Sequence, residues 1–513
     1  MKFIQKEDTI YNFFLSPAIP LFIIGGLIFL TNYDFWDGRI ISHAFEIDDF
    51  TGVENWFSSA GWLIQLFLIK CAYFIQSNLF ISGRFLLKLI AFCSLLALVN
   101  ESIKTGRKIY QFSDLEARLF GMIVAVFPAW STLISSVIFI YIFCTWLVYF
   151  GVRLIMSSSS IIIRSIGFIL TALSFELSSN FLFSIGLGFS YYCISIGLNN
   201  KSNNLEKKSR FRFVGIIILS FLSYALVRSF FWAYGLYEEY NQISLESFKS
   251  IFLSNKLGYL SFPVFIFISI ILSSVIYIKN FKWSNLKINK QKIILSPLIH
   301  GFILFIFASL PYLLVGKNTN IFAISDWDQR HSFLLSLPIA LILIGLGRLI
   351  NDLLSRSLKN RKIIIMPTIL ILFCLMLSGF YIKLSRASYE PGIINTLSLE
   401  PTPPPGILAI QTNNNIDPAM RFYEVNWLLY QAFNEELWYS NINRDKLNYE
   451  EDKRLNLIKD NQAYKNKYIM RDFSSSCSTD IKVNGENKIQ DILQWIFFKK
   501  SPNNFSVEIK SYC

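Results

Sequence analysis

Long apolar segments alternate with short polar loops along the first three quarters of the chain. Each segment is close to the roughly 20 residues that a helix needs to cross a bilayer. The pattern predicts about eleven spans, at residues 13–30, 61–81, 85–99, 130–150, 161–177, 181–198, 213–232, 257–278, 293–315, 333–350 and 363–382. Residues 1–384 are therefore predicted to form an α-helical polytopic membrane domain.

The pattern changes after the last predicted span. The prolines of EPTPPPGILA (residues 400–409) stiffen the chain, so residues 385–409 are predicted to be a linker. Residues 410–513 have an ordinary soluble composition and are long enough for a small α+β domain. We expect helices in this tail at residues 422–439 and 489–498.

Charge sets the predicted orientation. The chain is 16% charged, against about 25% in soluble domains, and its net charge is +13. The positive excess lies in short loops at 201–212, 279–292 and 355–362, and such loops mark the cytoplasmic side. The N-terminus is then cytoplasmic, and the loop at 33–62, the segment 100–129 and the tail are extracytoplasmic. Lys104, Arg107 and Lys108 do not fit, because they would lie outside.

The same distribution limits the partners. The basic loops are explained by topology and contact with membrane lipids, and no basic, aromatic surface for nucleic acid is present. Scarce glycine and frequent lysine, asparagine and isoleucine suggest an AT-rich bacterial genome. We therefore expect a multi-pass protein of the cell membrane, which in such a host is the inner membrane.

The first outer loop, residues 33–62, concentrates the candidate chemistry. Its six acids are Asp34, Asp37, Glu46, Asp48, Asp49 and Glu54. Tyr33 and Trp36 are among the aromatic residues around them, and partial shielding can raise a carboxyl pKa towards that of a general base. Asp37 is the first choice for that role, beside Gly38, and Asp34 is the second. The competing interpretation is a helix exit with solvated acids, which we prefer for Asp48 and Asp49.

A second polar cluster precedes the span at 333–350. The sequence ISDWDQRHSF (residues 324–333) places Asp326, Asp328, Arg330 and His331 together at the predicted membrane boundary. An arginine beside a histidine can bind a phosphate through charge-assisted hydrogen bonds. Arg228 is predicted near the outer end of another span. A charged cap on a span is the alternative interpretation.

Two shorter patterns complete the picture. Ser113 and Glu116 have capping-box spacing, so residues 113–128 are predicted to form a short interfacial helix that ends at Pro128. Cys477 and Cys513 in the tail could pair if the tail is extracytoplasmic, which the sequence leaves open. No cysteine and histidine spacing is typical of a zinc site.

The long acidic loop after the first span, the interfacial helix and the outer tail together resemble the GT-C superfamily of membrane glycosyltransferases. Asp34 and Asp37 in DFWDG resemble its acidic pair, whereas no WWDYG motif occurs in the tail. The resemblance implies transfer of a sugar from a polyprenyl-phosphate donor to a lipid, glycan or protein acceptor at the outer face.

The implied roles extend to further residues. Asp37 and Asp34 would be catalytic, and either could hold a divalent metal, Mg²⁺ or Mn²⁺, if one is needed. The donor phosphate would be bound by Arg330, His331 and Arg228. The substrate would be contacted by Tyr33, Trp36, Glu46 and Asp328.

Three alternatives stay open. A transporter or lipid flippase would place polar groups at mid-membrane on broken helices, and Pro297 and Pro338 could break helices here. A polysaccharide polymerase or ligase would depend on arginines in a large outer loop. A non-catalytic assembly protein would bind a partner through its tail and tolerate neutralisation of the acidic loop.

Overall fold

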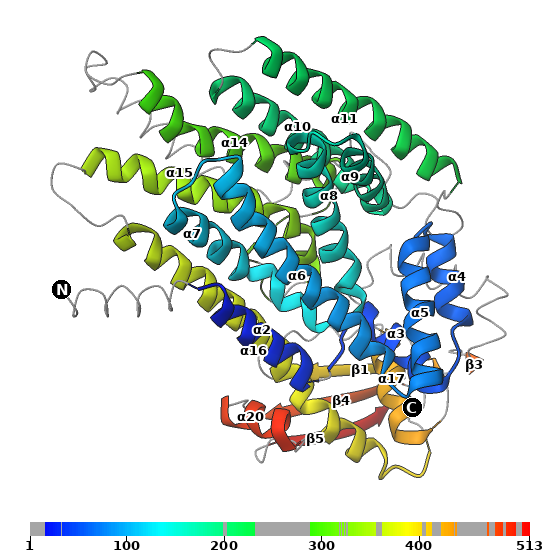
Figure 1. The fold of residues 1–513 in the computed structure, drawn as a ribbon. Coiled ribbons are helices and arrows are strands. Elements are labelled where there is room, and N and C mark those ends of the chain that lie inside the picture. The colour runs from blue at the N-terminus through cyan, green and yellow to red at the C-terminus, as the bar shows by residue number, and fades with distance from the viewer. Residues whose placement is uncertain are drawn as a thin grey trace.

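The computed structural model is mostly helical (Figure 1). It describes residues 16–31, 33–198, 203–230, 288–315, 317, 319, 321, 322, 324, 327–354, 362–402, 407–412, 422–434, 437–438, 469–470, 478–485, 489–498 and 505–512. The predicted span at 257–278, Asp326, Cys477 and Cys513 lie outside these residues.

The elements fall into a helical body and a mixed tail. The body contains α2 (Ala18–Thr31), α3 (Asp37–Ile47), α4 (Thr51–Ser59), α5 (Leu63–Leu79), α6 (Gly83–Lys108), α7 (Asp114–Ala125), η1 (Pro128–Ile134), η2 (Ser136–Ile138), α8 (Phe139–Ser157), α9 (Ile161–Leu173), η3 (Ser174–Glu176), α10 (Ser179–Leu198), α11 (Asn203–Phe230), α14 (Ile288–Leu314), η6 (Trp327–Leu335), α15 (Ser336–Leu354) and α16 (Lys362–Leu397). The tail contains β1 (Ile407–Thr412), α17 (Phe422–Phe433), β2 (Leu437–Trp438), β3 (Ile469–Met470), β4 (Ser478–Gly485), α20 (Ile489–Phe498) and β5 (Phe505–Tyr512).

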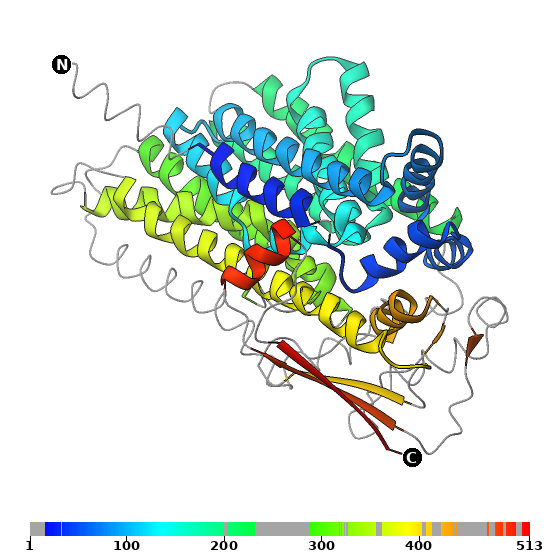
Figure 2. The ribbon, with the colours of Figure 1, turned by 90° about the horizontal axis from the view of Figure 1, so that it is seen from below.

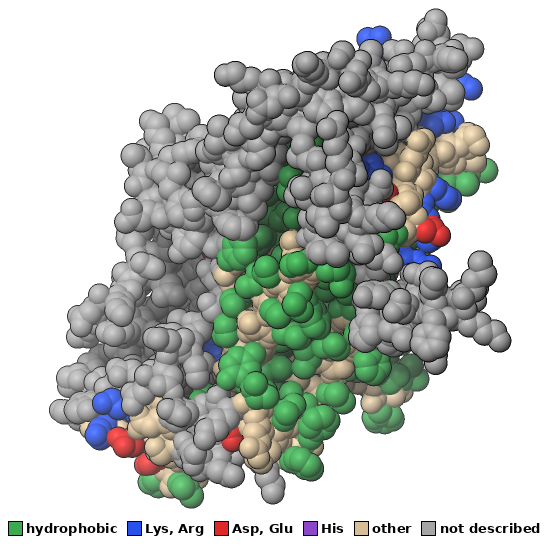
Figure 3. Space-filling view, turned by 90° about the vertical axis from the view of Figure 1, so that its left-hand side faces the viewer, with side chains coloured by type: hydrophobic (Ala, Val, Ile, Leu, Met, Phe, Trp, Pro, Cys, Tyr) green, Lys and Arg blue, Asp and Glu red, His purple; other side chains and the backbone are tan. Residues whose placement is uncertain are grey.

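Six helical segments of the described chain are long and apolar enough to cross a membrane. They are Gly83–Lys108, Ser136–Ser157, Lys208–Val227, Ser296–Leu314, Asp328–Leu349 and Met366–Leu397. A seventh is possible if α7 and η1, which meet at a bend of 48°, form one broken span. In Figure 3, hydrophobic side chains gather across the middle of one face, and the coloured charged side chains lie mostly towards its two ends. These features are consistent with a multi-pass membrane protein.

Helices α2 and α6 pack antiparallel. Phe29, near the end of α2, lies with its ring centroid 5.3 Å from that of Phe85 at the start of α6. At the other end, a Cβ added to Gly121 of α7 would meet both Ile103 of α6 and Pro17 just before α2. The loop that follows α2 and the loop that follows α6 therefore lie at opposite ends of the helical body. The sequence prediction instead placed residues 33–62 and 100–129 on one side of the membrane.

The difference from the sequence prediction arises at α5. Residues 61–81 were predicted to form a span, but α5 folds back along α4. Its Lys70 lies 3.0 Å from Glu54 of α4. Near its end, Gln76 Nε2 donates to the Phe45 carbonyl oxygen at 3.0 Å. The C-terminal end of α5 thus stays with the helices of the first loop. Figure 1 shows α4 and α5 side by side at this end of the body, which we call the α3 end.

Helix α7 begins with the predicted capping box. Ser113 caps the Glu116 backbone nitrogen, and the Glu116 side chain accepts from the Ser113 backbone nitrogen at 2.9 Å. The helix is not on the surface, because nine of its twelve residues are buried. Glu116 forms an ion pair of 2.8 Å with Arg348 of α15. The helix that was predicted at the membrane interface is thus packed within the helical body.

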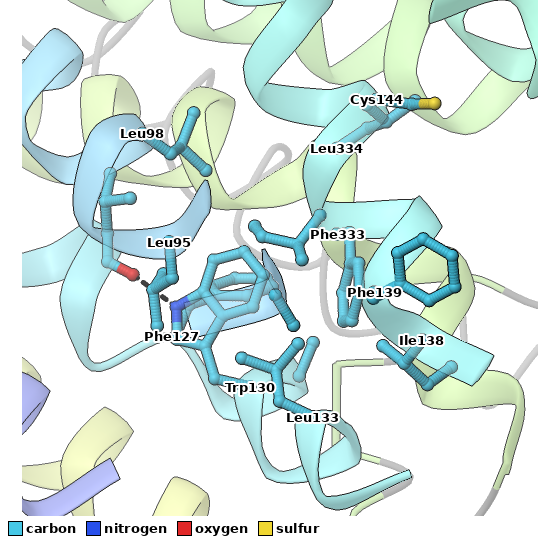
Figure 4. Close-up of a cluster of buried hydrophobic side chains, with 14 of the residues drawn as sticks. Leu95, Leu98, Phe127, Trp130, Leu133, Ile138, Phe139, Cys144, Phe333 and Leu334 are labelled. Carbon is cyan, nitrogen blue, oxygen red and sulfur yellow. Dashed lines mark hydrogen bonds between the residues drawn. The ribbon is translucent and has the colours of Figure 1, made fainter. Parts of the chain in front are cut away.

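Two short 3₁₀ segments, η1 and η2, follow α7 at the centre of the body. All residues of η1 and η2 are buried. Trp130 fills this region, with its Nε1 donating to the Val124 carbonyl oxygen at 2.6 Å and its ring 5.0 Å from that of Phe333 (Figure 4). The hydrophobic packing thus holds a stretch of irregular backbone between α7 and α8.

The tail is built onto the end of α16. This helix continues past the predicted boundary at residue 384 to Leu397, and β1 begins at Ile407, so the predicted linker of 385–409 is shorter. The three-stranded sheet has the order β1-β4-β5, with β1 parallel and β5 antiparallel to β4. Tyr389, Ile393 and Leu397 of α16 share a hydrophobic core with α17 and β4. The tail core is therefore partly made by the last helix of the body.

Candidate functional site

The first loop folds into α3 and α4 at the α3 end of the body. Trp36 precedes α3 with a φ of 48° and a ψ of −138°, and a positive φ is unusual for a bulky residue. Its backbone nitrogen donates to Glu424 Oε1 of α17 at 2.7 Å. Asp48, in the left-handed helical conformation, ends the helix. A contact from the tail thus helps to hold the backbone turn that starts α3.

Asp34 is completely buried beneath this turn. Its Oδ1 accepts from the backbone nitrogen of Ser136 at 2.9 Å, and its Oδ2 accepts from Ser42 Oγ at 2.6 Å. A Cβ on Gly38 would lie 1.9 Å from Oδ1, so the close approach expected at Gly38 is made by Asp34. Asp34 joins the turn, α3 and η2, and this position is that of a structural acceptor.

Asp37 has a different environment. It is the first residue of α3 and is half-buried, whereas its neighbours Trp36 and Gly38 are buried. The N-terminus of a helix stabilises a carboxylate through its exposed N–H groups and its dipole. Asp37 is the member of the predicted acidic pair whose side chain retains access to the surface.

A buried charge network lies beside Asp34 and Asp37. We use this name for Tyr33, Arg39, Arg386, Glu390 and Glu424. Arg39 of α3 forms an ion pair with Glu390 of α16, and Tyr33 donates to Glu390 Oε1 at 3.0 Å. Arg386 of α16 lies 2.8 Å from Glu424 of α17, measured from Nη2 to Oε2. Two cations and two carboxylates are thus matched across three elements.

Burial and neighbours fix the ionisation of the first-loop members. Burial raises the pKa of the Tyr33 phenol well above its usual value, so the hydroxyl remains a neutral donor. Burial by itself would lower the pKa of Arg39, but the Glu390 carboxylate and Tyr33 raise it overall. Arg39 also lies between two rings, 4.7 Å from the centroid of Tyr33 and 3.7 Å from that of Trp427. It is a permanent buried cation.

Glu46 ties the far end of α3 to its neighbours. Its Oε2 accepts from Trp427 Nε1 at 2.9 Å and from Gln431 Nε2 at 3.1 Å, both on α17. Its Oε1 lies 3.3 Å from Arg84 Nη1 at the start of α6. The predicted substrate contact at Glu46 therefore coincides with a position that fastens α3 to the tail helix.

The second predicted cluster lies in η6. Arg330 Nη1 and His331 Nδ1 lie 3.5 and 3.6 Å from Asp328 Oδ1. Arg330 and His331 are buried, whereas the Asp328 side chain is 43% exposed. The His331 ring stands 5.0 Å from that of Tyr312 on α14. Three of the four predicted residues are therefore brought together, and Asp326 lies outside the described residues.

The 3₁₀ segments connect the two clusters. Ser131 of η1 donates to Gln329 Oε1 of η6 at 3.1 Å, and Lys383 of α16 donates to Ser131 Oγ at 3.1 Å. On the other side, Ser135 Oγ donates to the Phe35 carbonyl oxygen at 2.9 Å. Side-chain hydrogen bonds therefore attach the segment that contains η1 and η2 to η6 on one side and to the first loop on the other.

The remaining predicted residues are placed as follows. Asp49 Oδ1 accepts from the Thr51 backbone nitrogen at 2.9 Å, in agreement with a turn role. The side chain of Arg228 lies outside the described residues. The sequence interpretation missed Arg386, Glu390 and Glu424. The i,i+4 spacing of Arg386 and Glu390 was a usable signal, but it fell in the stretch that was assigned to the linker.

A divalent metal at Asp34 does not fit this donor set. Both Asp34 oxygens are occupied by hydrogen-bond donors, and the residue has no exposure. Among the residues that the structure describes, no group of three or more histidine, cysteine, aspartate or glutamate side chains could hold a metal ion.

Comparison with known proteins gives no further guide. No model of a known protein family matches the chain, and no curated protein sequence matches it.

Proposed function

We propose that this protein is an integral membrane glycosyltransferase that moves a sugar from a polyprenyl-phosphate donor to a lipid, glycan or protein acceptor at the outer face. The observation that carries the proposal is the contrast between Asp34 and Asp37. Asp37 at the start of α3 is half-buried, whereas Asp34 is fully buried and accepts hydrogen bonds from Ser42 and Ser136. In the first loop, Asp37 is thus the candidate catalytic carboxylate, and Asp34 helps to fix the position of the turn before it.

In this proposal Asp37 is the general base that removes the proton from the acceptor hydroxyl. The oxygen then attacks the anomeric carbon, and the bond from that carbon to the donor phosphate breaks. The polyprenyl phosphate leaves with the electron pair. Asp34 is a positioning residue, because it contacts the turn before α3 and η2 and is closed to solvent.

The leaving phosphate needs positive charge. Arg330 and His331 are the first candidates, because they lie together in η6 with Asp328 at the longer distances of 3.5 and 3.6 Å. Arg39 is less suitable, because its guanidinium is already paired with Glu390 and enclosed by Tyr33 and Trp427. Tyr33, Trp36 and Glu46 hold α3 in place through the contacts described above. We therefore assign them a smaller part in substrate binding than Asp37.

We further propose that the chain crosses the membrane eleven times, as the sequence predicts, but with one crossing assigned to a different segment. Six of them would be the long apolar segments named above and a seventh the bent α7–η1 pair, and we add α2, α9 and α10 as three further crossings. The predicted span at 257–278 would be the eleventh. Compared with the sequence prediction, α7–η1 replaces α5. The N-terminus stays cytoplasmic and the first loop and tail stay outside, whereas Lys104, Arg107 and Lys108 move to the cytoplasmic side.

A transporter or flippase is the second candidate, and one observation favours it. Three 3₁₀ segments, η1, η2 and η6, interrupt the helices inside the body, and polar side chains of Ser131, Gln329 and Lys383 meet there. Irregular backbone at membrane depth is typical of transporter binding sites. In a transferase, the same breaks would shape the donor site.

The test compares Asp37→Asn with Glu54→Gln, a matched change of a partly exposed acid in the same loop. Each variant is expressed in the native host after the host's own gene for this protein has been deleted. Surface glycans and glycolipids are compared by gel and mass spectrometry, with membrane protein levels measured in parallel. We expect Asp37→Asn to lose product at a normal protein level and Glu54→Gln to retain it. Full product from Asp37→Asn would overturn the transferase assignment at this loop.

A further inference from the structure

Helix α20 of the tail has an apolar face on each of two sides. Ile492, Trp495 and Ile496 are buried and belong to the main hydrophobic core of the body. On an adjoining side, Ile489, Leu493 and Phe497 are 68%, 47% and 63% exposed. Their spacing of four residues places them along one side of the helix. A water-facing helix of a soluble tail would carry polar residues on this side.

The position of α20 identifies what lies against this stripe. The helix contacts both α2 and α16. Figure 2 shows it between them, and Figure 1 shows it at the lower edge of the molecule. Trp495 packs edge-on against Tyr33, which follows the end of α2, with ring centroids 5.9 Å apart. The helix therefore lies at the level where the apolar part of α2 ends.

The two helices that α20 contacts also expose apolar side chains. Phe22 and Leu30 of α2 are 82% and 56% exposed. On α16, Leu370 and Ile371 are 60% and 58% exposed, whereas residues 383–390 are buried. An apolar outer surface is therefore shared by α20 and both of its neighbours.

We propose that α20 lies in the membrane interface at the α3 end and anchors the tail to the lipid surface through Ile489, Leu493 and Phe497. A helix of ten residues is too short to cross a bilayer but suits a position in its plane. This inference does not depend on glycosyl transfer.

The test uses the full chain in liposomes of phosphatidylethanolamine and phosphatidylglycerol. Benzoylphenylalanine is introduced separately at Leu493, at the adjacent Gln494 on the polar side, and at Leu222, an exposed residue of α11. After irradiation, adducts are identified by mass spectrometry. We expect lipid adducts at Leu493 and Leu222, and several-fold fewer at Gln494.

Two outcomes would overturn the proposal. One is the absence of lipid adducts at Leu493 when Leu222 forms them, and the other is a cross-link from Leu493 to a second copy or another protein in place of lipid. If benzoylphenylalanine at Leu493 prevents folding, as judged by size-exclusion chromatography, Phe497 serves as the second reporter and is judged by the same outcomes.

Discussion

Arg386 of α16 and Glu424 of α17 form a buried ion pair, with 2.8 Å between Nη2 and Oε2 and side chains 8% and 3% exposed. Glu424 also accepts from the Trp36 backbone nitrogen, and so one carboxylate joins the last helix of the body, the tail and the first loop. The support of the candidate site is therefore shared by segments from both ends of the chain.

Removing one partner of this pair should destabilise the protein strongly. Glu424→Gln leaves the Arg386 cation buried without its counter-charge, which costs about 3–5 kcal/mol in comparable cases. The matched control is Lys70→Gln, which breaks a pair whose side chains are 50% and 43% exposed and should cost less than about 1 kcal/mol. Thermal unfolding in detergent measures both. Equal losses of stability would show that the buried pair has no special role.

Gly38→Ala should damage the turn that carries Asp37. The added Cβ would lie 1.9 Å from Asp34 Oδ1 and 2.3 Å from Ser135 Oγ, so the backbone must shift at a cost of about 1–3 kcal/mol. Gly26→Ala in α2 is the control, because its Cβ meets nothing within 4 Å. We expect the control to be neutral or slightly stabilising. Unfolding temperatures of the two variants decide the question, and a stable Gly38→Ala would contradict the described packing.

Cysteine labelling distinguishes the two membrane topologies. Asn78 and Lys108 are both exposed. Asn78→Cys and Lys108→Cys are made separately in a variant whose native cysteines have been replaced. With α5 folded back, an impermeant maleimide on intact cells should label residue 78 and not residue 108. The sequence prediction gives the reverse at both positions. Permeabilised cells, in which both should react, control for reactivity.

The β4–β5 register leads to a prediction about two cysteines. Ser478 lies opposite Tyr512, and the pairing is antiparallel. Cys477 and Cys513 are the next residues in the sequence beyond this pair, and they lie outside the described residues. We predict a disulfide between them when the tail is in an oxidising compartment. Peptide mapping without reductant should recover the linked pair, and two free thiols in protein purified without reductant would refute it.

Local patterns predicted the helical class and the capping box at Ser113, because both depend on neighbours within a few residues. They did not predict the packing of α5 against α4, because an apolar stretch of this length is typical of a span whether it faces lipid or another helix. They also did not predict that η1 follows α7 at a bend of 48°, because Pro128 was taken as the end of the helix.

The sequence predicted only part of the candidate site, because the contacts of that site also depend on residues far apart in the chain. Asp34 and Asp37 share one motif, yet one is sealed and the other half-buried. That difference comes from Ser136 and Gly38, and hydropathy does not register such contacts. Arg39 and Glu390 are 351 positions apart, so no local period connects them.

That separation has a consequence for biosynthesis. At about 5–20 residues per second, the first loop would leave the ribosome roughly 20–70 s before Glu390 is made, since 351 residues separate Arg39 from its partner. During this interval Arg39 has no Glu390, and Trp36 has no Glu424 to hold its backbone. The first loop would then reach its final packing only near the end of translation. Termination of translation before α17 would leave a membrane-inserted chain in which the first loop lacks its contact with Glu424. Quality-control proteases could recognise such a chain by its exposed first loop.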